Sequence, residues 1–222
     1  MKLIRIIFLI PSAFSLISTL VLPLSAEEPQ AGAAYTGKPY GGKPQIIPGN
    51  VMAGLYDVAP DNMNGIAYNR KGVARPGLAR STGDCIGLGV VGDDHVGTDG
   101  KKQKNGDVYV GWTEIGDWWK YTVQVKEAGT YYFGGKFAAG NKGAKITAEF
   151  MPIGKPAASA VTTGPVEVPT TAGFQPAVEV YHVWETLDKM AEIKLEPGLY
   201  VLTIKLDGRA GVNIQYYSFL KK

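Results

Sequence analysis

The run from Gly111 to Val125 constrains the fold more than any other feature of the chain. It holds three of the four tryptophans within eight positions, and from Trp118 onward its side chains alternate between two sets. A period of two residues places such sets on opposite faces of a β-strand. We therefore expect a strand that turns one face toward a core, with Trp119, Tyr121, Val123 and Val125 inward and Trp118, Lys120, Thr122 and Gln124 outward.

Short strands of the same kind follow along the chain, separated by turn sequences. The dipeptide Asn105-Gly106, a strong signal for a tight turn, precedes one of them. No segment carries the 3.6-residue period of a helix, and 29 glycines and 14 prolines punctuate the chain. This pattern predicts an all-β sandwich. The expected strands cover residues 107–112, 118–125, 130–137, 144–150, 190–195, 200–206 and 213–220.

Residues 1–26 have the pattern of a secretory signal peptide. Lys2 and Arg5 supply a positive start, a long apolar stretch follows, and Ala26 is the small residue before the expected cut. The alternative is a membrane anchor, because the apolar stretch approaches the length of a spanning helix. Two prolines within it favour cleavage, so we expect a secreted or periplasmic protein with no membrane contact afterwards.

Residues 27–45 are rich in glycine, alanine and proline, a composition that cannot bury enough apolar surface to fold. We expect them to form a flexible linker and the folded domain to span residues 46–222. Two parts of that domain, 60–106 and 151–180, have the composition of loops. In a sandwich, binding loops gather at one end.

Charge and cysteine content exclude several classes of function. The chain has 23 Lys and Arg against 20 Asp and Glu, and removal of the signal peptide would leave 21 cations. A near-neutral protein has no electrostatic basis for binding nucleic acid or an anionic membrane. The single cysteine, Cys85, cannot form an internal disulfide.

The sequence contains no recognisable catalytic motif. A glycosidase needs two carboxylates at a defined separation. The turn Asp93-Asp94-His95 matches no known cation-binding loop and is explained as a solvated acidic turn. We therefore expect a protein that binds rather than reacts. The carboxylates that lie in no catalytic motif are Glu114, Asp117, Glu185 and Asp188.

Several segments together resemble carbohydrate-binding module family 6. The most specific match is Val110–Val125, and Ala128–Tyr131 continues it. The resemblance covers residues 46–220 and implies a galactose-binding-like jelly roll, usually attached to secreted enzymes that degrade polysaccharides. The weaker matches, which follow in the family's order, are Ile47–Gly49, Gly65–Tyr68, Leu195–Ile204 and Gly211–Phe219.

The chain departs from this family at two places. The family's structural calcium uses two glutamates, and the matching positions here are Met52 and Gly54, whose side chains offer no oxygen to a hard cation. We therefore expect neither calcium nor another cofactor. The tyrosine wall of the family's sugar site corresponds to Ala79, so another aromatic side chain such as Tyr68 would have to replace it.

The resemblance places the sugar site in the loops at one end of the sandwich, where a tryptophan lies above an asparagine. Trp184 precedes Asn213 by 29 residues, about the interval of the family. A second alignment puts Phe174 at the tryptophan position; we favour Trp184 and expect it to be exposed, beside Tyr181 and His182. The alternative is that Trp184 caps the core at a strand end.

A pyranose ring suits such residues because its C–H faces are apolar. Covering one face with an indole removes about 60 Å² of apolar surface, worth about 1.5 kcal/mol, whereas a millimolar complex needs about 4 kcal/mol. Hydrogen bonds must supply the rest. Asn213 and Gln215 share one face of the last strand and can donate and accept, unless they hold a neighbouring loop. Trp118 is either a second contact or packed, and Trp112 is expected to be a packing residue.

These arguments predict a secreted, non-catalytic module that binds a polysaccharide or oligosaccharide by aromatic stacking and amide hydrogen bonds. A carbohydrate-active enzyme on another chain is a further expected partner. The alternative is a structural or interaction sandwich that has lost its sugar site. The predicted contact residues are Trp184, Asn213, Tyr181, Tyr68, His182 and Gln215.

Overall fold

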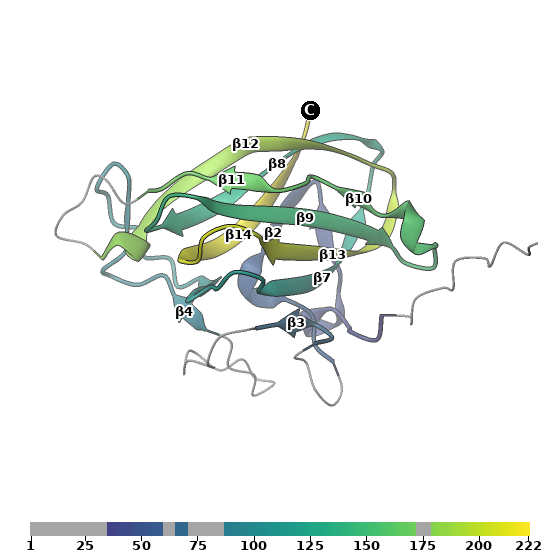
Figure 1. The fold of residues 1–222 in the computed structure, drawn as a ribbon, viewed down its shortest axis with the longest axis horizontal. Coiled ribbons are helices and arrows are strands. Elements are labelled where there is room, and N and C mark those ends of the chain that lie inside the picture. The colour runs from purple at the N-terminus through teal and green to yellow at the C-terminus, as the bar shows by residue number, and fades with distance from the viewer. Residues whose placement is uncertain (1–34, 60–64, 71–86, 172–178) are drawn as a thin grey trace, which may run out of the picture. The chain divides into compact units, whose positions relative to one another are not determined.

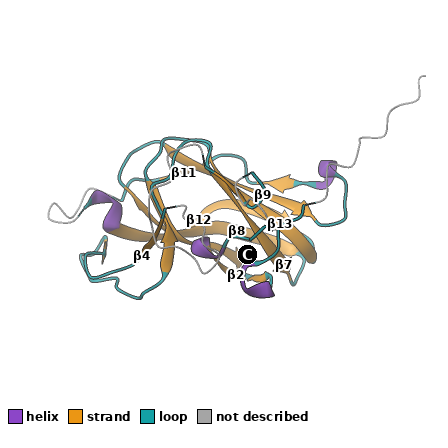
Figure 2. Cartoon of the chain, turned by 90° about the horizontal axis from the view of Figure 1, so that it is seen from below, coloured by secondary structure: helices purple, strands orange, loops and turns teal. Residues whose placement is uncertain are grey.

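The computed structural model describes residues 35–59, 65–70, 87–171 and 179–222, and these lie in one compact unit. Two β-sheets pack against each other in it, which confirms the predicted all-β jelly-roll sandwich (Figure 1). The helical segments among the described residues are four three-residue 3-10 turns, coloured purple in Figure 2. No helix in these ranges is long and apolar enough to cross a membrane. The predicted signal peptide and residues 27–34 lie outside the described residues.

The first sheet is built around the alternating strand that dominates the sequence. Its strands follow the order β1-β7-β13-β9-β10, with β3 also pairing with β7 and β11 with β9. β1 pairs in parallel with β7, and the pairs β7–β13 and β13–β9 are antiparallel. The strands are β1 (Gln45–Ile47), β3 (Tyr68–Asn69), β7 (Trp118–Val125), β9 (Ala144–Pro152), β10 (Val161–Thr162), β11 (Val166–Val168) and β13 (Gly198–Leu206).

The second sheet is built around three long strands, β8, β12 and β14. Its strands follow the order β4-β6-β14-β8-β12-β5, and β2 also pairs with β14. The long strand β8 lies between β14 and β12 and is antiparallel to both. The strands are β2 (Gly49–Met52), β4 (Leu88–Val90), β5 (Val96–Gly97), β6 (Val108–Val110), β8 (Gly129–Ala139), β12 (Val183–Leu195) and β14 (Val212–Lys221).

The main core lies between the sheets and contains the predicted inward face of β7. All four of its apolar side chains from Trp119 to Val125 are at most 2% exposed. Thr122, predicted to face outward, is also buried. The buried carboxylate of Asp57 accepts hydrogen bonds from the Thr122 backbone N–H at 2.8 Å and from the Thr122 hydroxyl at 2.6 Å. The alternation is therefore confirmed for the core face, and a buried polar contact covers part of the other.

Residues 35–45 differ from the predicted flexible linker. The backbone of Lys38 pairs with that of Val58 through two hydrogen bonds of 2.8 Å, and the Tyr35 hydroxyl donates to Asp57 Oδ2 at 3.0 Å. Backbone pairing does not depend on side-chain composition, so a segment poor in apolar residues can still dock on the domain.

The segment between β4 and β6 forms a second, smaller core on the opposite face of β8. Ala138 points to that face, while its neighbours Phe137 and Ala139 belong to the main core. Lys136 donates to Gln103 of the segment at 2.7 Å. The segment therefore covers part of the second sheet and brings its own side chains toward the loops at one sheet end. The buried residues of the small core are Val91, Tyr109, Ala138 and Trp184.

Candidate functional site

A cavity of about 860 Å³ lies where several loops meet at one end of the second sheet. This volume is in the usual range for sites that take small molecules. The strands β6, β8, β12 and β14 all contribute residues at or next to the same end. The lining comprises Leu88, Gly89, Val90, Asp94, His95, Tyr109, Trp112, Thr113, Glu114, Asn141, Glu179, Tyr181, His182, Ala210, Gly211 and Asn213.

Trp112 supplies the exposed aromatic surface of this cavity. Its side chain is 42% exposed, and its backbone has φ of 50°, the only positive φ of a described non-glycine residue. Such a conformation costs free energy and is a reason to look for function. Arg70 Nη2 donates to the Trp112 carbonyl at 2.9 Å. The expectation that Trp112 is a packing residue is therefore wrong, because the turn after β6 points its indole outward.

Tyr109 supports Trp112 from below, and the sequence reasoning missed it. The two rings are nearly parallel, with an interplanar angle of 21° and centroids 6.4 Å apart. A Cβ on Gly89 would lie 2.2 Å from the Tyr109 ring, so only glycine fits on the neighbouring strand. The signal was the alternation in β6: Val110 belongs to the main core, and Tyr109 must then face the other side.

Asn213 and Tyr181, both predicted contacts, lie together in the cavity lining. Asn213 is 6% exposed and its Nδ2 donates to the Tyr181 carbonyl at 2.8 Å. The Tyr181 hydroxyl accepts a hydrogen bond of 3.0 Å from Asn141. Because a Cβ on Gly140 would lie 2.3 Å from the Tyr181 ring, glycine is required beneath it.

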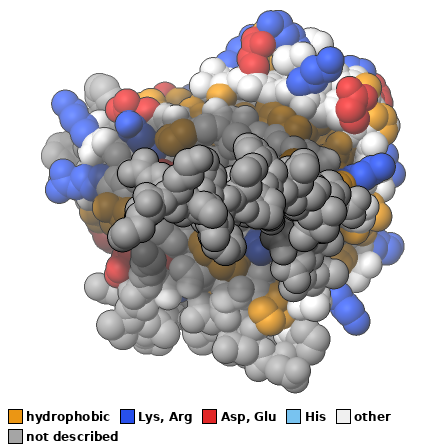
Figure 3. Space-filling view, turned by 45° about the vertical axis from the view of Figure 1, so that its right-hand side comes forward, with side chains coloured by type: hydrophobic (Ala, Val, Ile, Leu, Met, Phe, Trp, Pro, Cys, Tyr) orange, Lys and Arg blue, Asp and Glu red, His pale blue; other side chains and the backbone are white. Residues whose placement is uncertain are grey.

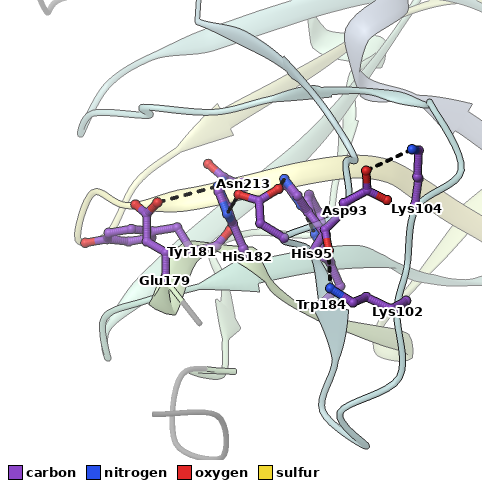
Figure 4. A network of polar contacts seen from close by, with 10 residues as sticks. Asp93, His95, Lys102, Lys104, Glu179, Tyr181, His182, Trp184 and Asn213 are labelled. Atoms are coloured by element: carbon purple, nitrogen blue, oxygen red, sulfur yellow. Dashed lines mark hydrogen bonds and ion pairs between the residues drawn. The ribbon is translucent and has the colours of Figure 1, made fainter. Parts of the chain in front are cut away.

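His182, also predicted, stacks on His95, which the sequence reasoning had assigned to a solvated turn. Their ring centroids are 4.0 Å apart at an interplanar angle of 16°. His182 Nδ1 lies 2.7 Å from Asp94 Oδ2, and its Nε2 lies 3.7 Å from Glu179 Oε2. Figure 4 shows His95 and His182 side by side, although they are 87 positions apart in the sequence. The stack therefore depends on the tertiary structure and has no signal in the local sequence.

Trp184 is buried, so the expectation that it is an exposed stacking surface is wrong. Its side chain is 2% exposed and belongs to the small core, in edge contact with Tyr109 at 5.3 Å. Its Nε1 donates to His95 Nδ1 at 2.6 Å. The start of β12 pairs with β5, and this pairing places the indole behind the cavity wall. The alternative residue, Phe174, lies outside the described residues.

The remaining predicted contacts, Tyr68 and Gln215, lie outside the cavity lining. Tyr68 is in β3 of the first sheet, where its ring makes an edge contact with Tyr56 at 5.6 Å. Gln215 is 1% exposed and its Nε2 donates to Asp107 Oδ2 at 2.5 Å. It shares the outer face of β14 with Asn213, as predicted, but the segment between β4 and β6 covers it.

The charges of the cavity lining are negative. Asp94, Glu114 and Glu179 contribute carboxylates, and no lysine or arginine is present among the described lining residues. Burial lowers the pKa of His95 to about 4 and raises that of Tyr109 to about 12, so both are uncharged near neutral pH. The site therefore offers uncharged donors and anionic acceptors.

Asp94, His95 and His182 are close enough to suggest a metal site, since one possible ligand atom of each lies within 4.8 Å of the others. His95 does not fit this role. The indole N–H of Trp184 occupies the lone pair of its Nδ1, so the neutral ring carries its proton on Nε2 and has no free lone pair. Asp94 and His182 then remain as a pair, fewer than the three protein ligands of a typical catalytic zinc.

The residues at the family's calcium positions do not fit calcium. Met52 offers only a thioether and Gly54 has no side chain. The side-chain amide of Gln45 occupies this turn instead: its Oε1 accepts from the Met52 N–H at 2.7 Å, and its Nε2 donates to the carbonyls of Met52 at 3.4 Å and Leu55 at 3.3 Å. Tyr121 donates to the Ala53 carbonyl at 2.9 Å. Protein donors thus satisfy carbonyls that would otherwise be free to bind a cation.

Comparison with protein-family models gives one match, described as carbohydrate binding module (family 6), over residues 91–221. This covers more than half of the chain and includes every described lining residue except Leu88, Gly89 and Val90. No curated protein matches the chain.

Several solved structures are similar in fold. The carbohydrate-binding module of Cellvibrio mixtus lichenase 5A in complex with cellotriose is 24% identical, with a TM-score of 0.40 over 53% of this chain and 80% of that chain. A β-1,3-glucan-binding family 6 module from Bacillus halodurans is 18% identical, with a TM-score of 0.46 over 80% and 99%. A Clostridium stercorarium module in complex with cellobiose is 14% identical, with a TM-score of 0.45 over 82% and 99%.

Proposed function

Because the chain belongs to carbohydrate-binding module family 6, we propose that its cavity binds an oligosaccharide or a segment of a polysaccharide without chemical change. The observation that carries this proposal is the combination of the exposed indole of Trp112 with the buried amide of Asn213 in one cavity. An indole suits the apolar face of a sugar ring, and an amide suits its hydroxyl groups.

Stacking on Trp112 supplies part of the affinity. Covering one sugar face with its indole is worth about 1.5 kcal/mol, or about a tenfold change in the dissociation constant. Tyr109 and the Arg70 hydrogen bond hold Trp112 in place before a ligand arrives. This preorganisation lowers the conformational entropy that binding would otherwise cost.

Hydrogen bonds supply the rest and fix the orientation of the sugar. Asn213 Nδ2 is engaged with the Tyr181 carbonyl, which leaves the amide oxygen to accept from a sugar hydroxyl. The carboxylates of Asp94 and Glu179 lie in the same lining and accept hydrogen bonds only. A hydroxyl-rich ligand supplies the donors that these acceptors need.

The signal-peptide pattern supports secretion, and we propose that the mature protein serves as a binding accessory to a carbohydrate-active enzyme. Expression with residues 1–26 in a bacterial host that exports proteins should yield an extracytoplasmic product that begins at Glu27. The N-terminal sequence and intact mass of the exported protein measure this. An uncleaved, membrane-bound product would support the anchor instead.

The Trp112→Ala variant tests the site. Affinity electrophoresis and calorimetry would use cellotriose, a soluble β-1,3-glucan and xylan as probes. We expect the parent to bind at least one of them and Trp112→Ala to bind it about tenfold more weakly. Trp118→Ala is the matched control, because Trp118 is half-buried in the first sheet and lies outside the cavity lining.

Three outcomes separate the candidate functions. Equal loss in both tryptophan variants would place binding elsewhere. No binding of any glycan by the parent would favour the structural or interaction sandwich, a reading consistent with the buried position of Trp184. Release of reducing sugar from a probe would contradict the non-catalytic role.

A further inference from the structure

The buried Trp184 and the cavity residue His95 form one unit. Trp184 Nε1 donates to His95 Nδ1 at 2.6 Å, and both residues are 2% exposed (Figure 4). The Trp184 ring packs in the small core with Val91, Tyr109 and Ala138. His95 lies in front of it, in the cavity lining and stacked on His182.

The chemistry of this hydrogen bond decides the protonation of His95. An indole N–H can only donate, so Nδ1 of His95 must present a lone pair and the neutral ring must carry its proton on Nε2. A second proton, on Nδ1, would set two N–H donors against each other at 2.6 Å. A ring flip would instead present a carbon to the indole N–H. Only the uncharged Nε2–H form satisfies both side chains.

The groups that face His95 leave its Nε2–H free to donate to a ligand. They are Asp94 in the same segment, His182 before β12 and Tyr109 of β6, with Glu179 beyond His182. Asp94 Oδ1 lies 3.7 Å from Nε2, too far for a hydrogen bond. The charge of Asp94 favours the protonated ring, whereas burial and the Trp184 donor disfavour it. Burial is the larger effect and lowers the pKa of His95 to about 4.

We propose that Trp184 is a positioning residue for sugar binding, whose indole N–H fixes His95 as an uncharged Nε2–H donor to a ligand hydroxyl oxygen. The inference rests on the proposed function. The Nε2–H group of His95 complements the acceptor oxygens of Asp94 and Asn213. A sugar hydroxyl can then donate a hydrogen bond to an acceptor oxygen and accept one from His95. Trp184 therefore affects affinity without contact with the ligand.

The Trp184→Phe variant tests the proposal, because phenylalanine keeps an aromatic ring in the small core and removes the N–H. Proton–nitrogen correlation NMR on the imidazole rings reports the tautomer directly. The chain has two histidines, so His182→Gln assigns the signals. We expect Nε2–H alone in the parent from pH 5 to 8, and in Trp184→Phe a mixture of tautomers that takes up a proton above pH 5.

Binding of the same full-length variants to cellotriose, β-1,3-glucan and xylan measures the consequence. We expect Trp184→Phe to bind about fivefold more weakly than the parent at pH 7.5, the effect of one hydrogen bond that is no longer fixed. His95→Phe should lose at least as much in affinity, and Trp184→Phe should add little to it. Trp118→Phe, the same change in the first sheet, should alter neither tautomer nor affinity.

The outcomes distinguish this proposal from the proposed function. A charged or Nδ1–H ring in the parent would overturn it, as would unchanged affinity in Trp184→Phe despite an altered tautomer. Weaker binding in Trp184→Phe with the Nε2–H form intact would make Trp184 merely structural and overturn it too. A parent that binds no glycan would instead refute the proposed function, on which the proposal depends.

Discussion

At the scale of single residues, the four tryptophans show how strongly environment decides role. Trp119 and Trp184 are each 2% exposed, Trp118 is half-buried and Trp112 is 42% exposed. Alternation in β7 predicted the burial of Trp119, because that strand is regular. Alternation could not predict the exposure of Trp112, which lies in a turn with positive φ, or the burial of Trp184, which lies at the start of β12 beside β5.

Gln45 should stabilise the turn at residues 52–55 in the place of calcium. We expect Gln45→Ala to lower the free energy of unfolding by about 1–2 kcal/mol, because the Met52 N–H and two carbonyls lose their partner. Urea unfolding measures this, with the exposed Glu167→Ala as a control within about 0.5 kcal/mol of the parent. A chelator should leave the melting temperature of the parent unchanged; a clear drop would reveal a cation that the turn binds after all.

His95 should make stability depend on pH. Its pKa is lowered by burial from 6.5 to about 4 in the folded protein, so between these values the unfolded chain binds a proton that the folded chain does not. The free energy of unfolding should therefore fall as the pH falls from 6.5 to 4, by about 3 kcal/mol at most from this group. Urea titrations at pH 7.5 and 5 should show a smaller fall for His95→Gln than for the parent. Equal falls would count against the neutral buried imidazole.

At the scale of elements, the sequence predicted the positions of the long strands but not the start of β12. The predicted strands at 118–125, 130–137, 144–150, 200–206 and 213–220 each lie within an observed strand. β12 was predicted from residue 190 but begins at Val183, because its register with β8 shifts between Leu187 and Ala191. That shift breaks the period of two on which the prediction depended.

The same irregularity predicts a strict requirement for glycine at position 134 of β8. A Cβ there would lie 1.9 Å from the Leu187 carbonyl oxygen of β12. We expect Gly134→Ala to destabilise the protein by about 1–3 kcal/mol or more, since a backbone atom of the neighbouring strand must move. Thermal and urea unfolding measure the loss.

Gly129→Ala, in the same strand, is the matched control. Its Cβ would meet only the flexible Lys221 side chain, at 3.2 Å from Cε. We expect a change within about 0.5 kcal/mol of the parent. Similar losses in both variants would show that strand glycines are needed here for another reason than the approach of β12.

At the scale of the whole molecule, the surface carries side chains of both charges, whereas the described cavity lining carries only negative ones. Figure 3 shows Lys and Arg side chains interspersed with Asp and Glu on the described part of one face. The described lining of the cavity instead carries three carboxylates and no lysine or arginine. The formal net charge of +3 therefore says little about which sugars the site accepts.

An oligosaccharide of uronic acids should accordingly bind more weakly than a neutral one of equal length. With about 0.5 kcal/mol of repulsion from each exposed carboxylate, we expect roughly a tenfold difference at low salt that shrinks in 0.5 M NaCl. Calorimetry with matched xylo- and galacturono-oligosaccharides measures it, and Glu179→Gln should narrow the gap. Stronger binding of the uronate would mean that cationic side chains outside the described lining attract the ligand more than the three carboxylates repel it.

The sequence by itself determined the sheet-forming pattern, the inward face of β7 and the membership of the family, because all three depend on the order of residues along single strands. It also predicted sugar contacts at Asn213, Tyr181 and His182, three residues that the structure gathers in one cavity lining. Only the tertiary structure decided that Trp112 is exposed, that Trp184 is buried, and that His95 joins the site. These three depend on which backbone segments pass beside one another, and contacts between residues 89 positions apart, such as Trp184 and His95, leave no local pattern to read.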